Sequence, residues 1–186
     1  MRKVDLKEVY EMACNARESI WQQAQSVGRE PKIYLHWTAG HYYTSFPEYH
    51  ICIDADGEII ESLPLTEIPQ ATWHRNSGSI AIALCCGVGA TAYKGDPYEV
   101  DLGEEPPTDA QIETLAQVMA AIADVFEIPI DNEHFLTHAE AADLDGYGPE
   151  TTCERWDLAV LSEDDEWMSG GNILRGKAIF YQNQGL

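Results

Sequence analysis

The stretch SIAIALCC, residues 79–86, decides the fold class of this chain. It is short and almost wholly apolar, which is typical of a central strand buried on both faces of a sheet. A second short run rich in strand-forming residues, KIYLHW at 32–37, predicts another buried strand. The two strands therefore indicate an α/β (α+β) domain, in which a central mixed sheet is flanked by helices.

Helical spacing, capping signals and turn residues predict the remaining elements. An Asp-Gly pair at 56–57 indicates a hairpin turn, and Thr108 with Gln111 forms a capping-box pattern. The expected helices are residues 4–27, a helix from that capping box to about Phe126, and about 172–182. The further expected strands are residues 49–54, 58–62 and 135–138. Residues 87–107 and 139–152 are predicted to be long acidic loops.

Length and charge limit the classes of function. The 186 residues suffice for a single domain spanning 1–186. Eleven Lys and Arg against 32 Asp and Glu give a formal charge of −21, which disfavours nucleic acids and anionic membranes as partners. No window reaches the ~18 apolar residues of a membrane span. Five cysteines and no evident signal peptide favour synthesis in the cytoplasm.

Two histidines and a cysteine are candidate metal ligands. His36 and His138 each stand at the C-terminal end of a predicted strand, and Cys153 follows 15 residues after His138. Two imidazoles and a thiolate can fill three tetrahedral positions around zinc and leave one open for water. The alternative is structural, with capped histidines at strand ends and a cysteine that acts as a small buried apolar residue.

Five short segments of the sequence resemble one known family. They are IYLHWTA at 33–39, EYHICIDADGEI at 48–59, WHRNSGSIAI at 73–82, THAE at 137–140 and CERWDL at 153–158. Their order and rough spacing are similar to those of the N-acetylmuramoyl-L-alanine amidases of the phage-lysozyme and peptidoglycan-recognition-protein family. The resemblance covers about residues 32–160, and five segments in order are more specific than any one alone.

The resemblance implies a zinc enzyme that acts on peptidoglycan. His36, His138 and Cys153 would hold Zn²⁺ in a groove at the edge of the sheet. The reaction would be hydrolysis of the amide between the lactyl group of N-acetylmuramic acid and the L-alanine of the stem peptide. Zinc suits this chemistry because it lowers the pKa of bound water to about 7 and polarises a carbonyl.

Further residues are assigned around this site. Tyr49 matches the family tyrosine near the metal and would hydrogen bond to the water or the oxyanion, and His74 would shuttle a proton or contact substrate. Their structural alternatives are an aromatic residue at a strand start and a loop histidine bonded to backbone. The side chains expected to line the groove for sugar and peptide are Trp37, Trp73, Arg75 and Asn76, although both tryptophans could instead belong to the core.

The sequence departs from the family pattern in three places. Ala83 stands where some members carry a glutamate as general base. Thr151 stands where others carry a lysine two residues before the third ligand, and a hydroxyl there could still donate to an oxyanion. The segment between His138 and Cys153 is also long, so the fallback oxygen ligands are Asp143, Asp145 and Asp157. Asp157 could instead cap a short helix over Leu158 to Leu161 or support the site indirectly.

Three functions remain open at this point. The first is a zinc amidase, a phage or prophage endolysin that is made in the cytoplasm, acts on the cell wall and has no anchoring module of its own. The second is a peptidoglycan-binding module of the same fold that does not hydrolyse. The third is a cysteine peptidase in which Cys153 is the nucleophile and His138 the base.

Overall fold

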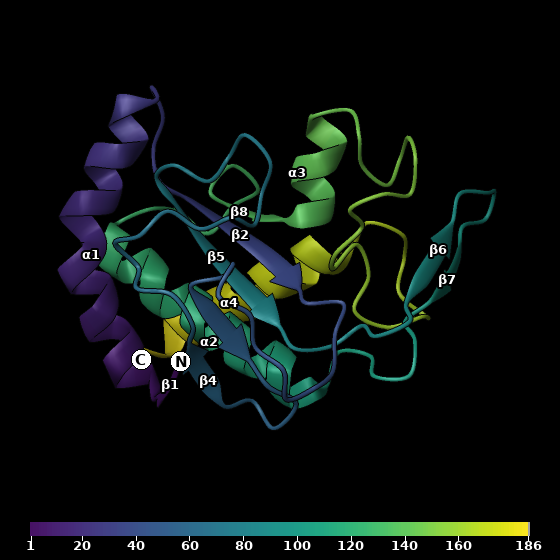
Figure 1. Cartoon of the computed structure of the whole chain (residues 1–186), viewed down its shortest axis with the longest axis horizontal. Coiled ribbons are helices and arrows are strands. Elements are labelled where there is room, and N and C mark those ends of the chain that lie inside the picture. The colour runs from purple at the N-terminus through teal and green to yellow at the C-terminus, as the bar shows by residue number, and fades with distance from the viewer. Residues whose placement is uncertain (186) are drawn as a thin grey trace.

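The computed structural model describes residues 1–185, which form a six-stranded mixed sheet with helices on both faces (Figure 1). The strand order is β1-β4-β3-β5-β2-β8. β5 pairs in parallel with β3 and β2, and β2 pairs in parallel with β8, whereas β4 is antiparallel to β1 and β3. The strands of this sheet are β1 (Arg2–Val4), β2 (Lys32–Trp37), β3 (Ile51–Ile53), β4 (Ile59–Glu61), β5 (Ser79–Leu84) and β8 (Phe135–Thr137). The predicted mixed sheet is confirmed.

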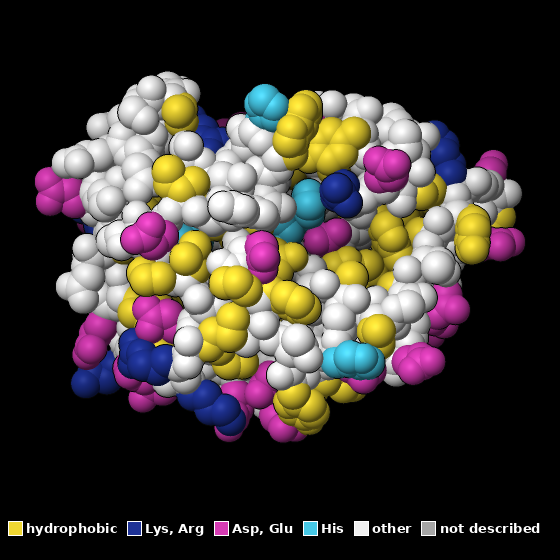
Figure 2. Space-filling view, in the orientation of Figure 1, with side chains coloured by type: hydrophobic (Ala, Val, Ile, Leu, Met, Phe, Trp, Pro, Cys, Tyr) yellow, Lys and Arg dark blue, Asp and Glu magenta, His cyan; other side chains and the backbone are white. Residues whose placement is uncertain are grey.

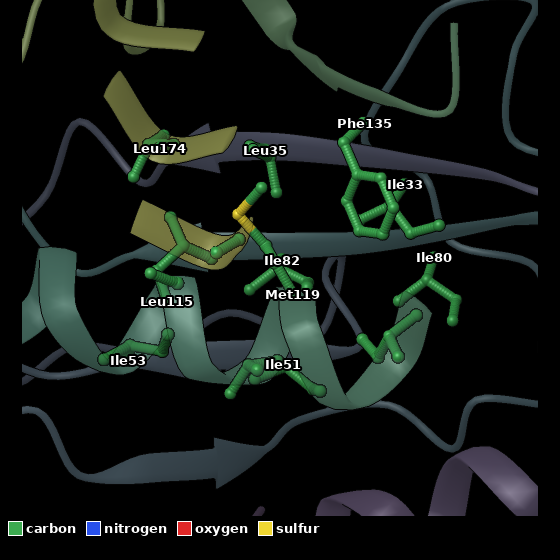
Figure 3. Packing of buried hydrophobic residues seen from close by; sticks show 14 of the residues in the cluster. Ile33, Leu35, Ile51, Ile53, Ile80, Ile82, Leu115, Met119, Phe135 and Leu174 are labelled. Atoms are coloured by element: carbon green, nitrogen blue, oxygen red, sulfur yellow. The ribbon is translucent and has the colours of Figure 1, made fainter. Parts of the chain in front are cut away.

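The main core lies between one face of the sheet and three helices, α1 (Leu6–Ser26), α2 (Asp109–Phe126) and α4 (Gly170–Gln184). Isoleucines from the central strands point toward α2, where Leu115 and Met119 meet them (Figure 3). The side chain of Gln111 is fully buried and donates to the carbonyls of Ile53 and Cys85, so the start of α2 is bonded to the ends of two strands. The Thr108–Gln111 capping box is also confirmed.

The opposite face of the sheet carries the candidate site. Because successive side chains of a strand alternate, Tyr34 and His36 face away from the core residues Ile33 and Leu35. α3 (His138–Leu144) covers part of this face, where its Ala141 packs against Tyr34 and Leu136. His36 is level with Ala83 of β5, which in turn is level with Cys52 of β3.

Three segments differ from the sequence prediction. The predicted loop over 139–152 begins with α3, because Thr137 and Glu140 form a capping box that starts a short helix directly after β8. The predicted loop over 87–107 contains the hairpin β6 (Thr91–Tyr93) and β7 (Glu99–Asp101), whose strands pair only with each other and are largely exposed. Because neither face of these strands is buried in the core, their side chains need not alternate between apolar and polar. Hydrophobic periodicity therefore gives no signal for them.

The chain start also differs, since Arg2–Val4 adds an edge strand and the first helix begins only at Leu6, after the N-cap Asp5. None of the helices in the described part of the chain is both long and apolar enough to cross a bilayer.

Candidate metal centre

Three side chains from distant segments converge on the face of the sheet that is opposite the main core. His36 lies near the end of β2, His138 is the first residue of α3, and Asp157 lies in the segment between α3 and α4. The Nδ1 atoms of the two histidines are 3.1 Å apart, and Asp157 Oδ2 lies 3.2 Å from His138 Nδ1 and 3.4 Å from His36 Nδ1. The structure therefore brings together both predicted histidines, with an aspartate as the third group.

The spacing of these three atoms fits a tetrahedral zinc ion. Ligand bonds of about 2.0–2.1 Å at the tetrahedral angle separate neighbouring ligand atoms by about 3.3–3.4 Å. The three observed separations lie close to that value. The other ring nitrogen of His36, Nε2, is 3.1 Å from the hydroxyl of the buried Thr72. If Nε2 donates to that hydroxyl, the lone pair of Nδ1 is left for a metal, which is the usual arrangement of a ligating histidine.

The electrostatics of the cluster also suit a cation. Burial lowers the pKa of His36 to about 4, so its imidazole is neutral near pH 7. Burial alone would raise the pKa of Asp157, but His138 and His36 outweigh it and hold that pKa well below its usual range. The group thus contains an ionised carboxylate and a neutral imidazole, which are the protonation states that bind zinc.

A strained turn presents Asp157. Arg155 and Leu158 on either side of it have positive φ values of 51° and 59°, which non-glycine residues rarely adopt. Trp156 between them is buried, and its indole meets Trp37 edge to face at 4.7 Å between ring centroids. No helix follows at 158–161, so the capping alternative for Asp157 is wrong.

Cys153 does not join the cluster. Its Sγ lies 3.6 Å from the Pro149 carbonyl, and burial raises its pKa above the ordinary value. A raised thiol pKa is the opposite of what a cysteine nucleophile needs, which weighs against the peptidase alternative. Thr151 donates its hydroxyl to the Gly148 carbonyl and is not among the residues lining the groove.

Asp157, one of the three fallback oxygen ligands expected from the sequence, lies in the cluster in place of Cys153, and the sequence before it holds a further signal. The family resemblance described above includes, in some members, a lysine two residues before the third ligand. Counted back from Asp157, that place is taken by Arg155, a cation, rather than by the neutral Thr151.

A groove of about 470 Å³ opens onto this cluster, lined by Trp37, Thr38, Ala39, Tyr49, Gln70, Ala71, Thr72, Trp73, Asn76, His138, Arg155 and Asp157. Figure 2 shows it near the centre of this face, where histidine side chains lie beside a basic and an acidic group. The Tyr49 ring centroid is 5.2 Å from that of His36. Burial, followed by the negative charge of Asp157, raises the pKa of Tyr49 well above its usual value, so the phenol keeps its proton.

The other predicted groove residues are placed as follows. Trp37 and Trp73 line the groove, the first almost buried and the second 62% exposed. Asn76 also lines it, but its side-chain oxygen accepts the backbone N–H groups of Ala71 and Thr72 and so holds the loop that carries Thr72. Asn76 therefore stabilises this loop independently of any contact with a ligand.

Arg75 and His74 face elsewhere. Arg75 donates two hydrogen bonds to the Asp145 carboxylate, at 2.8 and 2.6 Å. The guanidinium and the carboxylate are thus bonded to each other. Arg75 is therefore not free to receive a ligand carboxylate, and Asp145 is not a metal ligand here. His74 is exposed and lines a neighbouring pocket instead of the groove. Ala83 is fully buried in β5, so that position supplies no carboxylate.

Comparison with known proteins identifies the family of the chain. The family model described as N-acetylmuramoyl-L-alanine amidase matches residues 13–156. No curated protein sequence matches the chain. Among solved structures, the fold is similar to that of the Ph2119 endolysin from the Thermus scotoductus MAT2119 bacteriophage Ph2119, at 17% identity, with a TM-score of 0.51 over 81% of this chain and 86% of that one.

A second structural neighbour is the N-acetylmuramoyl-L-alanine amidase LysC from Clostridium intestinale URNW, at 16% identity. Its TM-score is 0.45 over 67% of this chain and 80% of that one.

Proposed function

The chain belongs to the N-acetylmuramoyl-L-alanine amidase family, and on that premise we propose that it is a zinc-dependent amidase of peptidoglycan. The bond cleaved is the amide between N-acetylmuramic acid and the L-alanine of the stem peptide. The enzyme acts on the cell wall as a phage or prophage endolysin. Membership of the family supports the reaction, and the likeness to a phage endolysin supports the fold.

One observation carries the metal part of the proposal. The two Nδ1 atoms and the carboxylate oxygen of His36, His138 and Asp157 lie 3.1–3.4 Å apart, as three zinc ligands would. These residues would hold the ion, and Asp157 replaces the cysteine expected from the sequence. When bound, zinc supplies an electrophile for the amide carbonyl and makes water a nucleophile near neutral pH.

Tyr49 and Arg155 are the residues that would act on the reacting amide. Both line the groove beside the cluster. Because Tyr49 keeps its proton, it serves as a hydrogen-bond donor to the developing oxyanion and not as a base. Arg155 adds a charge-assisted donor at the place that a lysine takes in some relatives, which compensates for the absence of a cation at Thr151.

We assign His74 no role in this step, since it lines the neighbouring pocket. Trp73, which is exposed, offers an apolar face on the groove side that suits a sugar ring, and the nearly buried Trp37 forms part of the groove wall. The lactyl group of the sugar would then point toward the cluster, with the peptide leaving on the other side.

The experiment that tests this proposal combines zinc content with amide hydrolysis. Wild type, Asp157→Ala and Cys153→Ala are purified, their zinc is measured by elemental analysis, and release of peptides with N-terminal L-alanine from purified peptidoglycan is followed. We expect stoichiometric zinc and activity in wild type and in Cys153→Ala, and loss of both in Asp157→Ala.

Two other outcomes would contradict parts of this proposal. Zinc without hydrolysis of any wall would indicate the binding module. Loss of zinc and activity in Cys153→Ala alone would return the third ligand to the cysteine and refute the role given to Asp157.

A further inference from the structure

A second pocket adjoins the groove. It has a volume of about 550 Å³, and its lining includes Arg29, Gln70, His74, Asn76 and Ser77. Gln70 and Asn76 also line the groove, so the two cavities meet at the loop between β4 and β5. A ligand whose scissile bond lies at the metal cluster could therefore extend past this loop into the second pocket.

The charge of the second pocket is unusual for this chain. Although 32 of the 186 residues are acidic, the lining contains one arginine and one histidine, and it contains no aspartate or glutamate within the described residues. By contrast, a pocket of about 620 Å³ at the contact of α2 and α4 is strongly acidic; its acidic lining residues are Asp109, Glu113, Glu163, Asp164 and Asp165. The second pocket is thus a local exception on a surface that otherwise repels anions.

Arg29 gives the pocket a positive charge that no carboxylate of residues 1–185 pairs with. Of the six arginines in the sequence, four form ion pairs with carboxylates. Within residues 1–185, Arg29 and Arg155 form none, and they line the two adjoining cavities.

The guanidinium of Arg29 is held in place by neutral partners. It donates to the backbone carbonyls of Arg75 and Ser77, the first at 2.6 Å, and lies 3.4 Å from the Tyr34 hydroxyl. These contacts hold the group beside the pocket, and because none of the partners is charged, they do not neutralise its positive charge. A fixed cation costs little ordering entropy when a ligand binds.

We propose that this second pocket, which we call the Arg29 pocket, binds a carboxylate of the stem peptide. The inference rests on the proposed amidase function. In the substrate, the lactyl carboxyl of the sugar is consumed in the amide, so the peptide is the part that carries free carboxylates. The positive pocket therefore takes the peptide, and the groove with Trp37 and Trp73 takes the sugar. Arg29 takes the role that the sequence suggested for Arg75.

The test is an equilibrium binding measurement that needs no turnover. Two probes are titrated into the full-length protein by calorimetry at low salt: a peptide with N-terminal L-alanine and free carboxylates, and the same peptide with its carboxylates amidated. We expect the wild type to bind the acid about five- to tenfold more tightly than the amide, as one partly screened charge pair allows. Arg29→Gln removes the preference, and Arg29→Lys keeps most of it.

A further variant guards against a folding defect. Arg29→Gln loses the bonds to the 75–77 loop, so its melting temperature is measured alongside. Ser77→Glu leaves Arg29 in place and adds a negative charge to the same lining, and it too should abolish the preference for the acid. Equal binding of acid and amide by the wild type would overturn the proposal, as would failure of the acid to bind at millimolar concentration. A preference that survives in folded Arg29→Gln and in Ser77→Glu would also overturn it.

The outcome is separable from that of the amidase proposal. A protein that hydrolyses peptidoglycan but binds acid and amide equally refutes only the Arg29 pocket. A protein that prefers the acid peptide but never hydrolyses peptidoglycan supports the Arg29 pocket and refutes the amidase proposal.

Discussion

The indoles of Trp37 and Trp156 meet edge to face at 4.7 Å, and each tryptophan is the chain neighbour of a residue in the metal cluster. Trp37 follows His36, and Trp156 precedes Asp157. The ring centroid of Trp167 lies 6.3 Å from that of Trp156, and Tyr98 stacks on Trp167 at 4.2 Å. This aromatic stack connects the β6–β7 hairpin to the backbone of two proposed ligands.

Shortening the Trp156 side chain should therefore weaken metal binding. In Trp156→Phe the smaller ring loses part of its contact with Trp37, and Asp157 is held less firmly. We expect zinc affinity to fall about 10–100-fold, the usual cost of losing a residue that supports a ligand. Competition with a chromogenic chelator measures this. The matched control is the exposed Trp73→Phe, whose zinc affinity should not change. An unchanged affinity in folded Trp156→Phe would contradict the positioning role.

Removing the Tyr49 hydroxyl should slow the reaction without removing the metal. Tyr49→Phe keeps the ring beside His36 and deletes only the donor. We expect kcat to fall about 10²-fold, as when a single oxyanion donor is lost, with zinc content unchanged. Tyr43→Phe, at an exposed tyrosine, is the control and should match wild type. A kcat close to wild type in Tyr49→Phe would show that the hydroxyl does not act on the reacting amide.

The positive charge of Arg155 should contribute to the catalytic rate. Arg155→Ala is expected to lower kcat/KM about 10²–10³-fold and Arg155→Lys considerably less, because lysine keeps the positive charge. Steady-state kinetics on soluble peptidoglycan fragments distinguishes the two variants. Arg2→Ala, which removes the ion pairs of Arg2 with Glu8 and Glu61 at the β1 edge of the sheet, serves as the control. Equal losses in the alanine and lysine variants would mean that shape, and not charge, is what the site requires.

The stability of the protein should fall as the solution becomes acidic, in part because of His50. Its Nε2 lies 3.1 Å from the Glu67 carbonyl, and its Nδ1 accepts the Ala81 N–H, so the buried ring is neutral. Burial lowers its pKa to about 4, against an ordinary value of about 6.5. The unfolded chain therefore binds more protons between these values. The contribution of His50 is complete above about pH 6.5 and is lost as the pH falls toward 4.

Urea unfolding at pH 7 and pH 5 measures this effect. His50 alone should account for about 2 kcal/mol of the difference in unfolding free energy. The variant His50→Gln, compared at both pH values in the presence of a chelator, should show a smaller pH dependence than wild type. An identical pH dependence in the two proteins would argue against the shifted pKa.

Much of the fold and two of the three residues of the metal cluster could be predicted from local sequence. The apolar run at 79–86 and the run at 32–37 are recognised as central strands because a strand buried on both faces is continuously apolar. These two strands form the centre of the sheet. His36 and His138 follow from their places at strand ends, because neighbouring parallel strands end at one edge. These signals lie within a few residues of the features that they predict.

The rest depends on contacts between distant segments. Cys153 and Asp157 are four residues apart, and which of them reaches the histidines is set by left-handed turns at Arg155 and Leu158 and by the packing of Trp156. No local propensity predicts such turns at non-glycine residues. Likewise, the pairing of Arg75 with Asp145 joins loops 70 residues apart, so a free arginine in the sequence proved to be engaged in the structure.

The three proposed ligands come from β2, from the start of α3 and from the segment before α4, so an ion bound among them would join parts of the chain that are far apart in sequence. Such an ion would act as a removable cross-link. Because it binds only the folded arrangement, zinc at 100 times its Kd would add about 2.7 kcal/mol to the unfolding free energy. A protease would then find fewer opened molecules, and resistance to digestion would rise and fall with the metal supply.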